Sequence, residues 1–243
     1  MRQTILAVPS ILYAAEIMNS TRPLIIVFSL LLIVFTGTVV QAEDKSLLKP
    51  VDEAAQNPSF FVFRARLIEA IANRDAKHLL SIVDPGIINE TGEDTLIKGI
   101  AGFREEWKPE AKDSKIWGEL GKVLSMGGKF KDGGKNFQAP YVSACFPEAL
   151  DLFEHSAILG EKVRLRKEPR NDAEVVATLS WDIVKMPLQS DEDGKTEEWK
   201  EVTTMDGRKG YVSSSYVFNM DSYTAIFEFR SGRWMMIMFA AGC

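Results

Sequence analysis

The chain has 243 residues, 46% of them hydrophobic, which is enough for one or two domains with substantial cores. It carries 29 Lys and Arg against 34 Asp and Glu, a net charge of −5. This acidic balance argues against nucleic acid and anionic membrane surfaces as partners, because binding to either requires clustered basic side chains.

The N-terminal region has the order of residues typical of a secretory signal peptide. Arg22 precedes a charge-free apolar run, residues 24–40, and small residues follow at Val40 and Ala42. Residues 1–42 are therefore predicted to be a leader that is cleaved after Ala42. The mature protein is then exported, periplasmic or secreted, with no membrane attachment. A retained transmembrane anchor is the alternative, since the run is close to the minimum length that spans a bilayer.

Residues 43–58 are polar, contain two prolines and are predicted to be a linker. Residues 59–154 are predicted to form a mainly helical domain, because apolar residues recur there at helical spacing. The expected helices begin at Phe60 with Ser59 as cap, after Asp75 as cap, and over 98–107 and 116–126. The stretch 130–136 contains two glycines and several charges, and it is predicted to be a loop.

Short strands separated by turn residues are predicted in residues 155–219. Apolar residues alternate with arginines in Val163-Arg164-Leu165-Arg166, and Val175, Ala177 and Leu179 alternate in the same way. Asp206-Gly207 is a strong hairpin turn, because glycine tolerates a positive φ there. Closely spaced short strands of this kind predict a small β-barrel.

This region resembles a bacterial SH3-like domain in Val163-Arg-Leu-Arg166…Pro169, in Trp199…Val202 and in Gly210-Tyr211-Val212…Tyr216. Arg164 and Glu168 depart from the family pattern, where Asn and Gly are usual. The resemblance implies a binding module of an exported protein, with a shallow groove lined by aromatic residues. The candidate ligand-binding residues are Trp181, Trp199, Tyr211 and Tyr216. For Trp199 a place in the core is an equally open interpretation.

Residues 220–243 are predicted to form a β-hairpin around Arg230-Ser231-Gly232-Arg233. Its strands are too apolar to stand alone, so we expect them to pack on the helices of 59–126. The predicted fold class is α+β, in which a small SH3-like β-barrel is inserted in, or packed beside, a helical domain completed by the C-terminal hairpin. The helix pair of 59–83 with this hairpin is also similar in pattern to the cone-shaped fold of nuclear-transport-factor-two-like and ketosteroid-isomerase-like proteins.

The chain lacks the common catalytic signatures. It contains no Gly-x-Ser-x-Gly, His-Glu-x-x-His, phosphate-loop or dinucleotide-binding motif, and its only histidines are His78 and His155. The acidic stretch 191–198 lacks the ligand spacing of an EF-hand. We therefore predict a non-enzymatic protein with no catalytic residue, no metal site and no cofactor.

The predicted function is binding of cell-wall peptidoglycan, or of a peptide of an envelope protein, through the SH3-like domain. One alternative is a small-molecule-binding or isomerase-like enzyme with a pocket in the helical and hairpin domain. Its candidate lining residues are Tyr141, Trp117, Phe227 and Trp234. The other alternative is a purely structural SH3-like domain that docks on its own chain.

Cys145 and Cys243 are the only cysteines. In an oxidising compartment they are candidates for a disulfide, and two unrelated thiols are the alternative.

Overall fold

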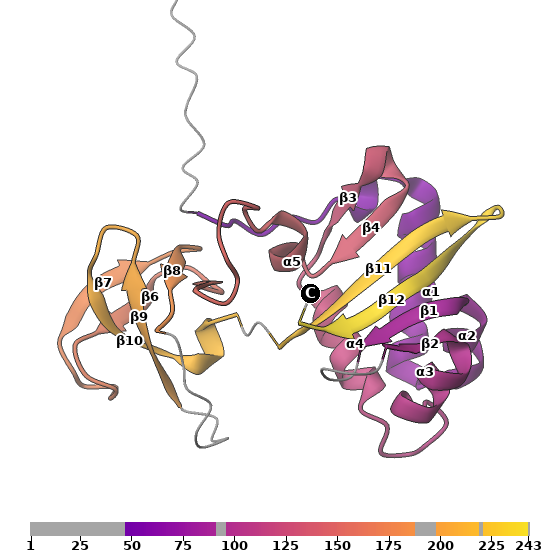
Figure 1. Ribbon diagram of the computed structural model, residues 1–243, viewed down its shortest axis with the longest axis horizontal. Coiled ribbons are helices and arrows are strands. Elements are labelled where there is room, and N and C mark those ends of the chain that lie inside the picture. Colours follow the sequence, from indigo (N-terminus) through magenta and orange to yellow (C-terminus); the bar gives the residue numbers. More distant parts are fainter. Residues whose placement is uncertain (1–46, 91–95, 188–197, 219–220, 243) are drawn as a thin grey trace, which may run out of the picture. The chain divides into compact units, whose positions relative to one another are not determined.

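Two six-stranded β-sheets organise the chain, which is α+β in a computed structural model (Figure 1). The structure describes residues 47–90, 96–187, 198–218 and 221–242, so the predicted signal peptide lies outside the described residues. The chain divides into two units, Met1–Ala42 and Glu43–Cys243, and everything below belongs to the second. Each sheet has its own hydrophobic core.

The first sheet combines segments from both ends of the second unit. Its strand order is β2-β1-β12-β11-β4-β3, in which β1 and β12 are parallel and the other neighbours are antiparallel. The strands are β1 (Val83–Glu90), β2 (Leu96–Lys98), β3 (Lys129–Lys131), β4 (Asn136–Ala139), β11 (Tyr223–Arg230) and β12 (Arg233–Ala241). Strands β11 and β12 are joined through Ser231 and Gly232, whose φ angles of 49° and 80° match a type I′ turn.

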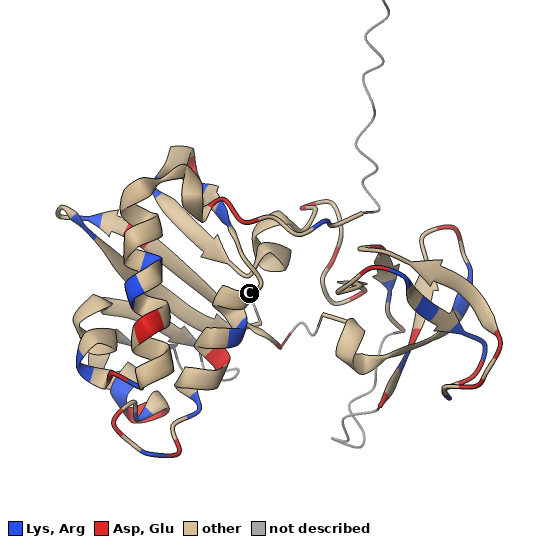
Figure 2. Cartoon of the chain, turned by 180° about the vertical axis from the view of Figure 1, so that it is seen from behind, with Lys and Arg blue, Asp and Glu red and all other residues tan. Residues whose placement is uncertain are grey.

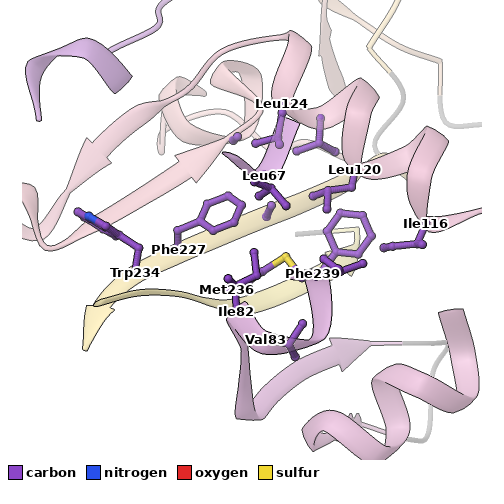
Figure 3. Close-up of a cluster of buried hydrophobic side chains, with 14 of the residues drawn as sticks. Leu67, Ile82, Val83, Ile116, Leu120, Leu124, Phe227, Trp234, Met236 and Phe239 are labelled. Carbon is purple, nitrogen blue, oxygen red and sulfur yellow. The ribbon is translucent and has the colours of Figure 1, made fainter. Parts of the chain in front are cut away.

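Helices cover this sheet. They are α1 (Pro58–Asn73), α2 (Ala76–Ile82), α3 (Gly99–Trp107), α4 (Ile116–Ser125) and α5 (Tyr141–Cys145), with a 3-10 turn, η1 (Ala54–Gln56), before α1. Helices α1 and α4 lie behind β11 and β12 in Figure 1. Leu67 and Leu120 point from these helices toward Phe227, Met236 and Phe239 of the sheet (Figure 3). The helices of the described part are all too short or too polar to be candidates for crossing a membrane.

The second sheet is formed by a continuous segment between α5 and β11. Its order is β5-β8-β9-β10-β6-β7, and all neighbours are antiparallel. The strands are β5 (His155–Ala157), β6 (Val163–Arg166), β7 (Val175–Leu179), β8 (Ile183–Lys185), β9 (Trp199–Thr204) and β10 (Lys209–Ser213), followed by a 3-10 turn, η3 (Ser214–Tyr216).

The predicted small SH3-like β-barrel is not confirmed, because the strands described do not close into a barrel. β5 and β7 are the two edges of an open sheet, and Ile158 meets Val217 only in an isolated bridge. Residue alternation correctly placed Val163, Leu165, Ala177 and Leu179 on the buried face, but it was wrong for Val175, which is 45% exposed because the register shift between its pairing and that of Ala177 interrupts the alternation of β7. It could not predict closure, because closure depends on pairing between the two edge strands.

Two local predictions are also corrected. α1 begins at Pro58 rather than Phe60, because its cap is Asn57, whose Oδ1 accepts from the N–H groups of Ser59 and Phe60 at 3.0 and 3.2 Å. The predicted loop at 130–136 contains the last two residues of β3, a 3-10 turn, η2 (Asp132–Gly134), and the first residue of β4, and Phe130 pairs with Phe137 across the ladder. By contrast, Asp75 caps α2 as predicted, accepting from the N–H of His78 at 2.9 Å.

Candidate ligand-binding surface

Trp199 and Tyr211 lie on one exposed side of the second sheet. Val202 and Val212 of the same strands are fully buried in the core of this sheet. Tyr211 pairs with Glu201, and Trp199 pairs with Ser213. Since paired residues share a side and i, i+2 residues share a side, all four side chains project away from the core. Trp199 and Tyr211 are therefore diagonal neighbours, within reach of each other across the two strands.

We call these four residues the β9–β10 face: Trp199, Glu201, Tyr211 and Ser213. Both aromatic residues are half-buried, and Glu201 is exposed. Such a face offers flat apolar rings beside a carboxylate, which suits a ligand with both apolar and cationic groups. The sequence pattern had singled out the two aromatic residues, but not Glu201, whose position depends on the strand register.

Arg166 supports this face from the next strand. It pairs with Tyr211, and its own side chain is 8% exposed. Its Nη1 donates to the carbonyl oxygen of Ala173 at 2.7 Å. The segment that precedes β7 therefore holds the guanidinium group of Arg166 and covers it from solvent. Arg166 lies on the side of β6 away from the core, as the alternation predicts, since it pairs with Tyr211; it is buried there because the chain around Ala173 covers it.

Trp181 and Tyr216 form a second pair around Gly160. The N–H of Trp181 donates to the carbonyl of Gly160 at 3.0 Å, and the N–H of Leu159 donates to the carbonyl of Tyr216 at 2.7 Å. A Cβ on Gly160 would lie 3.7 Å from Cδ1 of Tyr216. Tyr216 is 47% exposed and Trp181 is half-buried.

Trp181 adopts an uncommon backbone conformation. Its φ is 62°, in the left-handed region that bulky residues avoid at a cost of about 1–2 kcal/mol. Hydrogen bonds hold the residue on both sides, because its carbonyl also accepts from the N–H of Leu48 at 2.7 Å. The indole Nε1 lies 3.4 Å from Oε1 of Glu161. The ring of Trp181 is therefore placed by its backbone beside an acidic side chain.

No ring-to-ring contact joins the four candidates in the part of the chain that the structure describes, where the contacts found belong to the first sheet and its helices. Trp199 and Tyr211 lie on β9 and β10, whereas Trp181 precedes β8 and Tyr216 lies in η3. We therefore treat the two pairs as two candidate surfaces.

The interior between α1 and the first sheet is filled by aromatic side chains. The ring of Phe60 lies 4.2 Å from that of Phe137 and 4.8 Å from that of Trp234, measured between centroids. The four residues expected to line an isomerase-like pocket are all at most 5% exposed: Trp117, Tyr141, Phe227 and Trp234. Glu228, on the same strand as Phe227, forms an ion pair with Arg230, with 2.7 Å between its Oε2 and Nη2 of Arg230. The four candidate lining residues are therefore packed in the core, and Glu228 is held at the surface by Arg230.

A surface hollow of about 350 Å³ lies beside α1 and α2 instead. It is lined by Arg66, Glu69, Ala70, Asn73, Asp75 and His78. The lining is charged and open to solvent, unlike the enclosed apolar site that small-molecule chemistry usually requires. Among the side chains whose positions are described, no three His, Cys, Asp or Glu residues gather closely enough to hold a metal ion.

Cys145 and His155 do not form a nucleophile pair in this structure. His155 is buried, and its Nδ1 lies 3.0 Å from the carbonyl oxygen of Asp151. Burial raises the pKa of the Cys145 thiol, although Lys129 and Lys131 partly oppose the shift. A raised pKa disfavours the thiolate, which is the reactive form. Cys243 lies outside the described residues, so its pairing with Cys145 stays a prediction.

A third apolar cluster bears on the structural alternative. It is composed of Leu48, Tyr141, Val142, Ala157, Ile183 and Phe218. Residues that flank or belong to the second sheet are therefore covered by other parts of the same chain. None of the four aromatic candidates belongs to this cluster.

No protein-family model matches the chain, and no curated protein is significantly similar to it.

Proposed function

We propose that this chain is an exported, non-enzymatic binding protein whose SH3-like domain binds cell-wall peptidoglycan or a peptide of an envelope partner. The observation that carries the proposal is the β9–β10 face, where Trp199 and Tyr211 lie diagonally on the side away from the core. Peptidoglycan offers sugar rings, which stack on aromatic side chains, and peptide stems that carry amino groups. Glu201 supplies the carboxylate that pairs with such an amino group.

The short antiparallel strands around one small core support the reading of residues 155–219 as an SH3-like domain. The Trp181–Tyr216 pair is a second candidate surface for the same ligand. Its support is the left-handed backbone of Trp181, since unusual conformations of this kind concentrate at functional sites.

The test is co-sedimentation of the Glu43–Cys243 chain with purified peptidoglycan sacculi. We expect the chain to pellet, and Trp199→Ala or Tyr211→Ala to weaken binding by about tenfold, as for a central aromatic contact. Phe153→Ala is the matched control, because Phe153 is a 70% exposed aromatic residue outside both surfaces. Circular dichroism checks that each variant is folded.

Each outcome separates the parts of the proposal. If the chain pellets no more than a control protein does, peptidoglycan is rejected as its ligand. Pelleting that survives Trp199→Ala and Tyr211→Ala, but not Trp181→Ala or Tyr216→Ala, moves the site to the second pair. Binding that no aromatic variant weakens rejects both surfaces.

A further inference from the structure

On the outward side of the second sheet, an acid and a base lie on either side of an aromatic ring. Basic and acidic segments both occur along this sheet (Figure 2), and the strand register decides which charges lie close together. Tyr211 of β10 pairs with Glu201 of β9 and with Arg166 of β6. We call these three residues the outer row. Neighbouring strands are about 4.8 Å apart, so the Cα atoms of Glu201 and Arg166 are about 10 Å apart.

The residues that precede the outer row support this placement. A Cβ on Gly210 would lie 3.0 Å from Cγ of Leu165, which is fully buried in the core of the second sheet. Gly210 and Leu165 therefore face the core together. Successive residues of a strand face opposite sides, so Tyr211 and Arg166 face outward together.

Arg166 is a buried cation without an acidic partner in the described part of the chain. It is 8% exposed, and the carbonyl oxygen of Ala173 accepts from its Nη1 at 2.7 Å. None of the ion pairs found among the described residues includes it. Glu168 and Asp172, in the segment that covers it, are both paired with Arg170 instead. Buried charges are normally paired, so this guanidinium group is suited to a carboxylate from outside the chain.

The guanidinium group of Arg166 keeps donors that a ligand can reach. A guanidinium has five N–H groups, and the contact with Ala173 uses one of them. Nε and Nη2 have no partner among the described residues, and neither belongs to the fully enclosed polar atoms there, so both keep contact with solvent. The planar array of donors in a guanidinium matches the two oxygens of a carboxylate.

Glu201 gives the other end of the outer row the opposite charge. It is exposed, and it forms no ion pair with the residues described, Arg166 included. Tyr211 lies between the two charges in the register. A ligand with an ammonium group and a carboxylate about 10 Å apart therefore matches the row in charge and in length.

We infer that the outer row binds a peptide stem of peptidoglycan that has a free carboxylate, with Arg166 holding this carboxylate and Glu201 holding an amino group of the same stem. The inference rests on the proposed function and narrows the ligand to the peptide part of the cell wall. Each residue of an extended peptide spans about 3.5 Å, so charged groups about three residues apart match the row. Arg166 is then a residue that determines specificity.

Calorimetric titration of the Glu43–Cys243 chain with synthetic peptides tests the carboxylate contact. The probe is a stem peptide with one lysine and a free C-terminal D-alanine carboxylate, compared with the same peptide ending in an amide. We expect the amide to bind the unchanged chain about tenfold more weakly, because a charge-assisted contact is lost. Equal binding of the two peptides to the unchanged chain overturns the inference, whether or not any variant folds.

Arg166→Gln tests whether Arg166 is the source of this preference. The acid and the amide should bind this variant equally, within about twofold, because the group that distinguishes them is gone. If Arg166 only supports the fold, the variant weakens both peptides by the same factor and keeps the tenfold preference, which would overturn the inference.

Arg164→Gln is the matched control. Arg164 lies two residues earlier on the same side of β6, and it is exposed. This variant loses the same charge outside the outer row, so it should keep the preference for the carboxylate. A loss as large as that in Arg166→Gln would show that the preference comes from general positive charge, and the outer row would be rejected as the site.

Competition with sacculi tests the source of the peptide. An excess of the free stem peptide should release at least about half of the pelleted chain, as expected for a shared site. A chain that pellets with sacculi but binds neither peptide keeps the proposed function and overturns this inference. Peptide binding that leaves pelleting unchanged, or that occurs without pelleting, rejects the cell-wall stem as the ligand of the row. A chain that does neither overturns both.

Discussion

Tyr141 shows how a single buried group makes stability depend on pH. Its side chain is 3% exposed, in the third apolar cluster. Its hydroxyl has no hydrogen-bond partner among the residues described. Burial, with a smaller contribution from Cys145, raises the pKa of Tyr141 to about 12. The folded chain therefore holds this proton over a pH range in which the unfolded chain, with a pKa near 10, releases it.

The sign follows from the raised pKa. Below pH 10 both states keep the proton and the contribution is complete; between pH 10 and 12 only the folded state keeps it, so stability falls as pH rises. The free energy of unfolding of the unchanged chain should fall by about 2 kcal/mol between pH 10 and 12 because of Tyr141, and Tyr141→Phe should not show this fall. At pH 7 the same variant should be neutral or slightly stabilising, because no hydrogen bond is lost. Denaturant unfolding at pH 7, 10 and 12 measures the difference between the two chains, and equal slopes with pH would contradict it.

At the scale of the elements, α1 depends on how its first turn is capped. Asn57 accepts two backbone N–H groups, and Pro58 occupies the first helical position, where its missing N–H is no loss. Ser59 serves another purpose, because its Oγ accepts from Nε1 of Trp234 at 3.0 Å. Asn and Ser are both common N-cap residues, so the sequence alone does not decide between Asn57 and Ser59. The contact of Ser59 with Trp234 of β12 gives Ser59 a different role here.

Removing the cap should therefore lower stability. Asn57→Ala is expected to reduce the free energy of unfolding by about 1 kcal/mol, since two N–H groups lose their acceptor. Gln56→Ala, one residue earlier and exposed, is the control and should change it by less than about 0.5 kcal/mol. Denaturant titration followed by circular dichroism measures both, and a harmless Asn57→Ala would show that another group caps the helix.

At the scale of the whole molecule, the two sheets have separate cores. The first unites segments from residues 54–139 and 225–239, whereas the second is built from residues 158–217 only. Contacts within each core are shared by its own strands, so each sheet is expected to lose its protection from hydrogen exchange as a unit.

Leu165→Ala tests this division. Leu165 is fully buried in the core of the second sheet, and its truncation should cost about 3 kcal/mol. We expect faster amide exchange in β6, β9 and β10, while β11 and β12 keep their protection. Exchange that accelerates equally in both sheets would show that they unfold together.

Local patterns correctly predicted much of the chain. The spacing of apolar residues predicted a helix over 116–126, where α4 runs from Ile116 to Ser125 with Trp117, Leu120, Val123 and Leu124 buried. It also placed the cap of α2 at Asp75. It missed β3, because three residues beside a glycine turn carry too little periodicity, and Phe130 is recognisable as a strand residue only through its pairing with Phe137.

The sequence alone identified most of the residues buried along a strand or helix, since alternation and helical spacing are local properties of the chain, but it missed the burial of Arg166 and the exposure of Val175. It also identified the four aromatic candidates, but not how they group. The tertiary structure decided that Trp199 and Tyr211 share a side with Glu201, that Trp181 and Tyr216 meet around Gly160, and that the second sheet stays open. It also left Phe61 and Ile68 of α1 exposed, because only the neighbouring elements decide which apolar residues of a helix are covered.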